Sequence, residues 1–179
     1  MSIDIEFLKY PIGKFQIPNE ISLEKIQEAA EIIKAFPKNL FMAVSPFSTE
    51  QLDTPYRPGG WTVRQLVHHC ADSHMNAFVR FKLALTEDNP TIKPYEEAEW
   101  AKLPDYSLPV EPALALIKAV HLKLGTLLES MSPEDFQRTY FHPESKRTQS
   151  LGEVALMYAW HSQHHLAHIQ HLFLRNFDQ

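Results

Sequence analysis

Apolar residues recur with helical spacing in four long segments of the chain. The first segment follows Ser22, a suitable N-cap, and reads LEKIQEAAEIIKAF. Its apolar positions Ile26, Ala29, Ala30 and Ile33 fall at i, i+3, i+4 and i+7, which places them on one face of a helix. This spacing predicts an amphipathic helix.

Pro37 comes directly after this segment and is expected to break or bend the helix. Proline has no backbone N–H, and its ring clashes with the carbonyl one turn earlier. The sequence KNLFMAV that follows is expected to continue the helix beyond the proline.

A second helix is predicted after the turn sequence RPGG. Thr62 is its expected N-cap, and VRQLVHHCADSHMNAFVRFKLAL runs on from there without glycine or proline. One face of this helix is apolar apart from a single histidine, and it comprises Val63, Leu66, Val67, Cys70, His74, Ala77, Phe78 and Phe81.

The third and fourth helices follow from the same kind of pattern. The third occupies roughly 110–131 and opens at Pro112, a residue suited to a first helical turn. The fourth begins at Ser150, which forms a Ser-x-x-Glu capping box with Glu153. Four amphipathic helices of this length predict an all-α four-helix bundle, formed by residues 1–179 as a single domain.

Two connections are not simple loops. Residues 88–109 contain four prolines together with two tyrosines and a tryptophan, so a packed crossover is expected rather than a disordered one. Residues 138–149, RTYFHPESKRTQ, favour a short β-hairpin.

Composition narrows the class of protein. The net charge is −5, and no basic run is present, which argues against nucleic-acid binding. The single cysteine, Cys70, excludes an internal disulfide and fits a reducing, cytoplasmic setting. The N-terminus does not resemble a signal peptide, and no apolar run approaches the ~20 residues that a membrane span needs.

Half of the ten histidines lie in the short stretch WHSQHHLAHIQH at 160–171. On a helical wheel His165 falls within the apolar face of the fourth helix, and His161 falls at its edge. Residues four apart are neighbours on a helix, so these two imidazoles could reach one metal ion. A third ligand would then have to come from another helix.

The remaining histidines have plainer interpretations. His164 and His171 point towards the other face of the helix and are expected to be solvated, and His168 is left open between core, neighbour of a ligand and ligand. In the second helix the wheel alone selects His74 as the third ligand, because it lies at the centre of the apolar face. His69 lies to one side of that face.

The stretches LDTPYRPGGWTVRQLVHHCADSHMNAFVRFKLAL and WHSQHHLAHI resemble the YfiT group of the DinB-like superfamily. The similarity extends to PYEEAEW, YFHP and YPIGKF and so covers nearly the whole chain. It implies a four-helix bundle with up-down-down-up connectivity, often a homodimer. Members of this group are described as metal-dependent hydrolases, and relatives are thiol transferases that act with bacillithiol.

The resemblance also implies a ligand set. One histidine of the second helix, at the position of His69, and an HxxxH pair, at His161 and His165, would hold one divalent ion per chain, zinc or nickel. The pair agrees with the wheel, whereas His69 conflicts with the wheel's choice of His74. We follow the resemblance and expect His74 to be a core histidine, hydrogen-bonded near the site.

Three functions are compatible with these ligands. The first is hydrolysis of a small-molecule substrate by metal-activated water, and the second is transfer of a low-molecular-weight thiol. Thiol transfer would need a basic group for an anionic thiol, for which Arg64, Arg80 and Lys82 are candidates. The third function is non-catalytic metal binding. No HExxH general base flanks the pair, and no nucleophile elbow is present, which argues against a zincin protease and a serine hydrolase.

Overall fold

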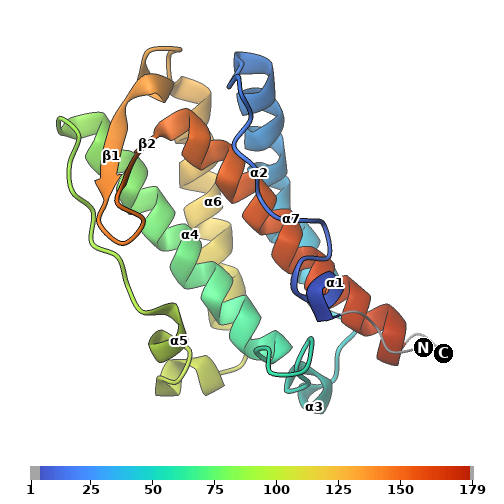
Figure 1. Cartoon of the computed structure of the whole chain (residues 1–179). Helices are drawn as coiled ribbons and strands as arrows, with labels where there is room; N and C mark the ends of the chain where they lie inside the picture. The colour runs from blue at the N-terminus through green and yellow to red at the C-terminus, as the bar shows by residue number, and fades with distance from the viewer. Residues whose placement is uncertain (1–4, 178–179) are drawn as a thin grey trace.

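The computed structural model describes residues 5–177 and contains four long helices (Figure 1). They are α2 (Leu23–Val44), α4 (Val63–Thr86), α6 (Glu111–Ser130) and α7 (Leu151–Asn176). Both α2 and α4 pack against α6 and α7, so α2 and α4 lie diagonally across the bundle. Figure 1 shows α2 and α7 running in one direction and α4 and α6 in the other. The expected four-helix bundle with up-down-down-up connectivity is confirmed.

The predicted N-caps are present. Ser22, Thr62 and Ser150 each accept a hydrogen bond from the backbone N–H three residues later. The reciprocal half of the box predicted at Ser150 does not form, because the Glu153 carboxylate instead accepts from Arg147 at 3.1 Å. The start of α7 is therefore fixed to the adjoining strand as well as capped.

Pro37 does not break the helix, because α2 runs continuously from Leu23 to Val44, and the expected continuation through KNLFMAV is confirmed. The half after the proline keeps its apolar face, with Leu40 and Val44 buried in the core. This packing compensates for the backbone hydrogen bond that proline cannot donate. The consequence is an Ile33 carbonyl that lacks its helical partner, since the missing donor is the N–H of residue 37.

Shorter elements lie in the segments that precede and connect the long helices. They are α1 (Ile5–Lys9), α3 (Thr49–Leu52), α5 (Glu97–Trp100), the 3₁₀ helices η1 (Pro104–Ser107) and η2 (Asp135–Gln137), and the strands β1 (Thr139–His142) and β2 (Arg147–Ser150). The strands pair antiparallel, which confirms the hairpin. The crossover between α4 and α6 is packed as expected, with Ile92 and Tyr106 buried.

The core consists of two apolar clusters, one towards each end of the bundle. The cluster at the hairpin end includes Ile33, Phe81, Leu124 and Leu151, and the cluster at the α3 end includes Leu40, Leu66, Ile117 and Leu172. Between these two clusters, histidines from three helices lie in the interior. They are His74 in α4, His121 in α6 and His161, His164, His165 and His168 in α7. A layer of imidazoles therefore crosses the bundle. Within residues 5–177 no helix combines the length and the apolar character that crossing a membrane requires.

Candidate metal centre

Two helices bring three imidazoles together. His69 lies in the second turn of α4, and His161 and His165 lie one turn apart in α7. One ring nitrogen from each of the three falls within 4.8 Å of the others. The ring centroid of His69 lies 5.5 Å from that of His161 and 5.0 Å from that of His165. The three residues expected from the resemblance therefore meet at one point, and their role as ligands stays a prediction.

The spacing of these nitrogens suits a single ion. The Nε2 atoms of His161 and His165 are 3.1 Å apart. Two nitrogens that each lie ~2.0–2.1 Å from one zinc ion are ~3–4 Å apart. The His69 side chain also leaves its Nδ1 atom buried without a hydrogen-bond partner. Unpaired polar atoms are uncommon in a protein interior and often mark an ion or water site.

The surroundings keep the three rings neutral. Burial lowers the pKa of His69 to about 4. Burial, followed by the charges of the neighbouring imidazoles, holds the pKa values of His161 and His165 well below the usual range. A neutral imidazole has one nitrogen lone pair free, which is the form that binds a metal. At neutral pH the site therefore presents ligands rather than cations.

His74 lies behind this group rather than within it. Its Nε2 atom is 3.1 Å from the Nδ1 atom of His161, on the side of that ring facing away from His165. The side chain is fully buried. This is the hydrogen-bonded core position that the resemblance implied, and His74 does not share the common point reached by the three nitrogens.

A second group of imidazoles overlaps the first. Ring nitrogens of His164, His165 and His168 also fall within 4.8 Å of one another, and the Nε2 atoms of His164 and His168 are 3.1 Å apart. The expectation that His164 is solvated is wrong, because its side chain is only 8% exposed. His171 is half-buried, and its ring stacks on Phe7.

The N-terminal segment explains why His164 is buried. The His164 ring stacks on Trp160 at 4.6 Å, and Trp160 donates a hydrogen bond to the Gly13 carbonyl. The Tyr10 ring lies 6.2 Å from His164 on the same side. Residues 10–15 thus cover the face of α7 that the wheel assigned to solvent.

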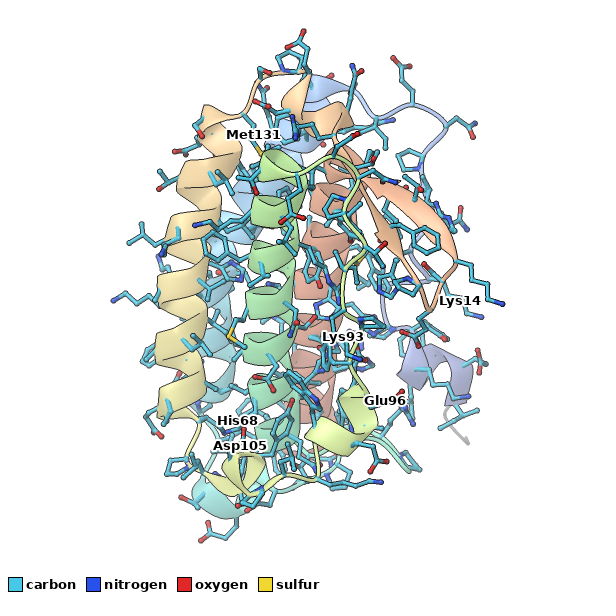
Figure 2. All side chains as sticks on the ribbon, turned by 90° about the vertical axis from the view of Figure 1, so that its left-hand side faces the viewer. Lys14, His68, Lys93, Glu96, Asp105 and Met131 are labelled. Carbon is cyan, nitrogen blue, oxygen red and sulfur yellow. The ribbon has the colours of Figure 1, made fainter. Side chains whose placement is uncertain are left out.

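Other polar residues of α4 and α7 lie apart from this point. His68 faces the crossover between α4 and α6, where its Nε2 atom lies 3.2 Å from the Leu108 carbonyl oxygen (Figure 2). Glu153 is paired with Arg147, and Asp72 accepts from the Tyr106 hydroxyl. The Tyr158 ring, in contrast, contacts His161, at 5.5 Å between centroids.

Sequence reasoning missed the part played by His121. It is 1% exposed in α6, and its Nε2 atom is 2.7 Å from the Nδ1 atom of His74. A signal was present, because His121 continues the apolar face formed by Ile117, Leu124 and Leu128. A histidine at such a position needs buried polar partners.

Comparison with known proteins places these residues in a family. The DinB superfamily model matches residues 32–169. A protein of Oceanobacillus iheyensis is 54% identical over 167 residues, which cover 93% of this chain and 96% of the relative. A protein of Bacillus mycoides is 50% identical over 165 residues, which cover 92% and 95%. The names of both assign them a metal-dependent hydrolase activity.

A solved structure resembles the whole chain. YfiT from Bacillus subtilis superimposes with a TM-score of 0.92 at 43% identity, covering 94% of this chain and 97% of YfiT. It is described as a probable metal-dependent hydrolase with an unusual four-helix bundle topology.

Proposed function

This chain belongs to the DinB superfamily, and from that membership we propose that it is a metal-dependent hydrolase whose ion is held by His69, His161 and His165. The observation that carries the proposal is the meeting of three neutral imidazole nitrogens, from two helices, in the interior of the bundle between its two apolar clusters. Three protein ligands leave coordination positions open, as in catalytic rather than structural zinc sites.

The chemistry divides between the ion and the chain. When bound, a divalent ion such as zinc or nickel supplies Lewis acidity, which lowers the pKa of a water molecule or of an approaching thiol. The chain supplies the ligand geometry and the dry surroundings. His161 is the one partly exposed member of the three, so a small-molecule substrate would approach from its side. Gln163 points to solvent, and the Ser162 hydroxyl donates to the Tyr158 carbonyl, so neither of them serves as a general base.

One observation favours thiol transfer as the second candidate function. Of the three basic residues suggested for an anionic thiol, Arg64 pairs with Asp53 at 2.7 Å, and Lys82 lies on the surface. Arg80 is only 8% exposed, and no carboxylate oxygen of residues 5–177 lies within 4.0 Å of its guanidinium. The Glu97 carboxylate interacts with Arg80 only at longer range. Buried charges are normally paired closely, so a buried arginine without a close carboxylate suits the anionic group of a ligand.

Phenols connect Arg80 with the histidines. Arg80 lies near enough to Tyr140 and Tyr158 to offset part of the rise in their pKa values that burial causes. The Tyr158 hydroxyl donates to the Ser73 carbonyl, and its ring packs against His161. The Tyr158 phenol therefore lies close to the proposed ligand His161 and within the electrostatic influence of Arg80.

The proposed function is tested by turnover of the metal-loaded protein. We expect zinc- or nickel-loaded protein to hydrolyse an activated aryl ester, to lose this activity after dialysis against a chelator and to regain it when the ion returns. A parallel assay supplies a small thiol and a model electrophile. Turnover in the second assay alone would support thiol transfer, and turnover in neither would contradict both functions.

The position of Arg80 leads to a separate prediction, that the enzyme prefers an anionic substrate to a neutral one. We expect kcat/KM to be higher for the hemisuccinate of an aryl alcohol than for the neutral acetate of the same alcohol. Because a hydrogen bond to a charged group contributes about 1.5–3 kcal/mol, Arg80→Gln should reduce this preference by about 10- to 100-fold. Lys82→Gln, an exposed cation on the same helix, is the control and should leave the preference unchanged. An unchanged preference in Arg80→Gln would remove Arg80 from substrate binding.

The choice between zinc and nickel and the homodimer stay predictions from the family resemblance, and the cytoplasmic setting stays a prediction from the single cysteine.

A further inference from the structure

A continuous line of hydrogen-bonding groups runs from α2 to the proposed ligand His161. The Nδ1 atom of His121 lies 2.5 Å from the Ile33 carbonyl oxygen, and its Nε2 atom lies 2.7 Å from the Nδ1 atom of His74. The Nε2 atom of His74 lies 3.1 Å from the Nδ1 atom of His161. Four helical residues, one each from α2, α6, α4 and α7, are thus linked across the bundle.

The line starts at Ile33 because Pro37 leaves the Ile33 carbonyl without its helical hydrogen-bond donor. In an α-helix the carbonyl of residue 33 accepts from the N–H of residue 37, and proline has no such hydrogen. The Ile33 carbonyl lies in the interior, where an unpaired oxygen is unfavourable. His121 donates to it from the neighbouring helix and replaces the missing partner.

A carbonyl oxygen can only accept, and this fixes the direction of every bond that follows. The Nδ1 atom of His121 must carry the hydrogen, so in the neutral ring its Nε2 atom is an acceptor. His74 must then donate from Nδ1 and accept at Nε2. His161 in turn must donate from Nδ1, which leaves the lone pair on its Nε2 atom, the atom that faces His165.

The surroundings leave little freedom for another arrangement. His74 is fully buried and His121 is 1% exposed, so water does not compete for their ring nitrogens. The Phe36 ring stacks on His74 at 5.2 Å and packs against His121 at 5.4 Å. The Tyr158 ring meets His74 edge-on at 5.1 Å. These contacts restrict the rotation of both imidazole rings.

We propose that Pro37 and the Ile33 carbonyl, acting through His121 and His74, hold His161 in its Nδ1–H tautomer and so direct its Nε2 lone pair at the ion. His74 and His121 are positioning residues in this scheme. The two histidines of the HxxxH pair are then unequal: His161 is already arranged for binding, whereas His165 must donate from Nε2 to His161 until an ion arrives. The importance of this arrangement for metal binding rests on the proposed function, but the tautomer does not.

The tautomer is read directly by ¹⁵N NMR of metal-free protein labelled in its histidines. Pyrrole-type and pyridine-type nitrogens have well-separated shifts, so each ring is assigned at neutral pH. We expect His121, His74 and His161 all to carry the hydrogen on Nδ1. An Nε2–H tautomer at His161 in the wild type would overturn the proposal, whether or not the protein proves to be a hydrolase.

Variants then test the cause. His74→Leu should release His161 from the Nδ1–H form and weaken zinc affinity by about 10- to 100-fold, the usual cost of losing an outer hydrogen-bond partner. His74→Gln, whose amide oxygen can accept from His161, should retain the tautomer and most of the affinity. His68→Leu removes a buried imidazole from the same helix without touching His161, and should change neither.

Pro37→Ala tests the start of the line and also favours folding, because alanine is the better helix former. The restored N–H would compete with His121 for the Ile33 carbonyl. We expect weaker zinc binding and a mixture of tautomers at His161, in a protein at least as stable as the wild type. Unchanged tautomers in both Pro37→Ala and His74→Leu would show that the line of histidines does not position His161. If His74→Leu does not fold, the wild type, His74→Gln and Pro37→Ala still decide the question.

Discussion

The free energy of unfolding of the metal-free protein should fall steeply as the pH falls from 6.5 towards 4. Seven histidines, six of them buried and His161 half-buried, have lowered pKa values in the folded state, namely His69, His74, His121, His161, His164, His165 and His168. Burial is the first cause in each of them. All seven are neutral when folded at neutral pH and take up protons on unfolding at mildly acidic pH.

The sign of the effect follows from proton linkage. Below the unfolded pKa of about 6.5, the unfolded chain binds more protons than the folded chain, so the free energy of unfolding falls with pH. The loss continues down to the folded pKa values, about 4 for His69, His121 and His164 and about 3 for His168. Above pH 7 the stability from these groups is fully present.

The expected size is large. Each histidine that stays neutral in the folded state contributes a slope of up to ~1.4 kcal/mol per pH unit. Three such histidines acting together would therefore remove about 4 kcal/mol per unit, a large part of the ~5–15 kcal/mol that stabilises a typical domain. Urea denaturation at a series of pH values between 7.5 and 4.5 measures this slope.

Zinc provides the control for that measurement. An ion that binds only the folded chain adds stability, and its ligands must lose their protons to bind it, so zinc-loaded protein should unfold at a lower pH. A free energy of unfolding that stays level between pH 7 and 5 in metal-free protein would contradict the neutral, buried state of these imidazoles.

Loss of any one of the three proposed ligands is expected to remove high-affinity metal binding. The His69→Ala, His161→Ala and His165→Ala variants each leave two imidazoles at the site, too few to hold a catalytic ion firmly. The fall in zinc affinity should exceed the ~10- to 100-fold loss expected when only an outer partner is removed. Competition titration with a chromogenic chelator measures the affinity, and circular dichroism verifies the fold.

The overlapping group of histidines supplies matched controls. His164→Ala and His168→Ala remove buried imidazoles from the same helix, and they should keep zinc affinity within a few-fold of the wild type. His165 belongs to both groups, so its variant cannot distinguish them. If His168→Ala loses the ion while His69→Ala retains it, the ion belongs to the second group, and the proposed site is wrong.

Local rules accounted for the helices and for one pair in the site. The apolar spacing and the caps at Ser22, Thr62 and Ser150 depend on residues within one or two turns, which the sequence displays directly. The same is true of His161 and His165, because i and i+4 are neighbours on any helix. These features needed no knowledge of how the helices pack.

Features that depend on tertiary packing were not visible in the same way. The helical wheel favours His74 over His69 as the third ligand because His74 lies nearer the centre of the apolar face. A wheel does not show which neighbouring helix a side chain contacts. His164 is buried by Trp160 and by residues 10–15, which are distant in the sequence. A helix can likewise continue through Pro37 only because the core beyond it is well packed and because His121 satisfies the Ile33 carbonyl.

The central claim concerns the place of the ion, and anomalous diffraction from crystals grown with zinc locates it. We predict one anomalous peak per chain, within ~2.0–2.1 Å of one nitrogen each of His69, His161 and His165, with the remaining positions open to solvent. A peak among His164, His165 and His168 instead, or no peak in this layer at saturating zinc, would contradict the account.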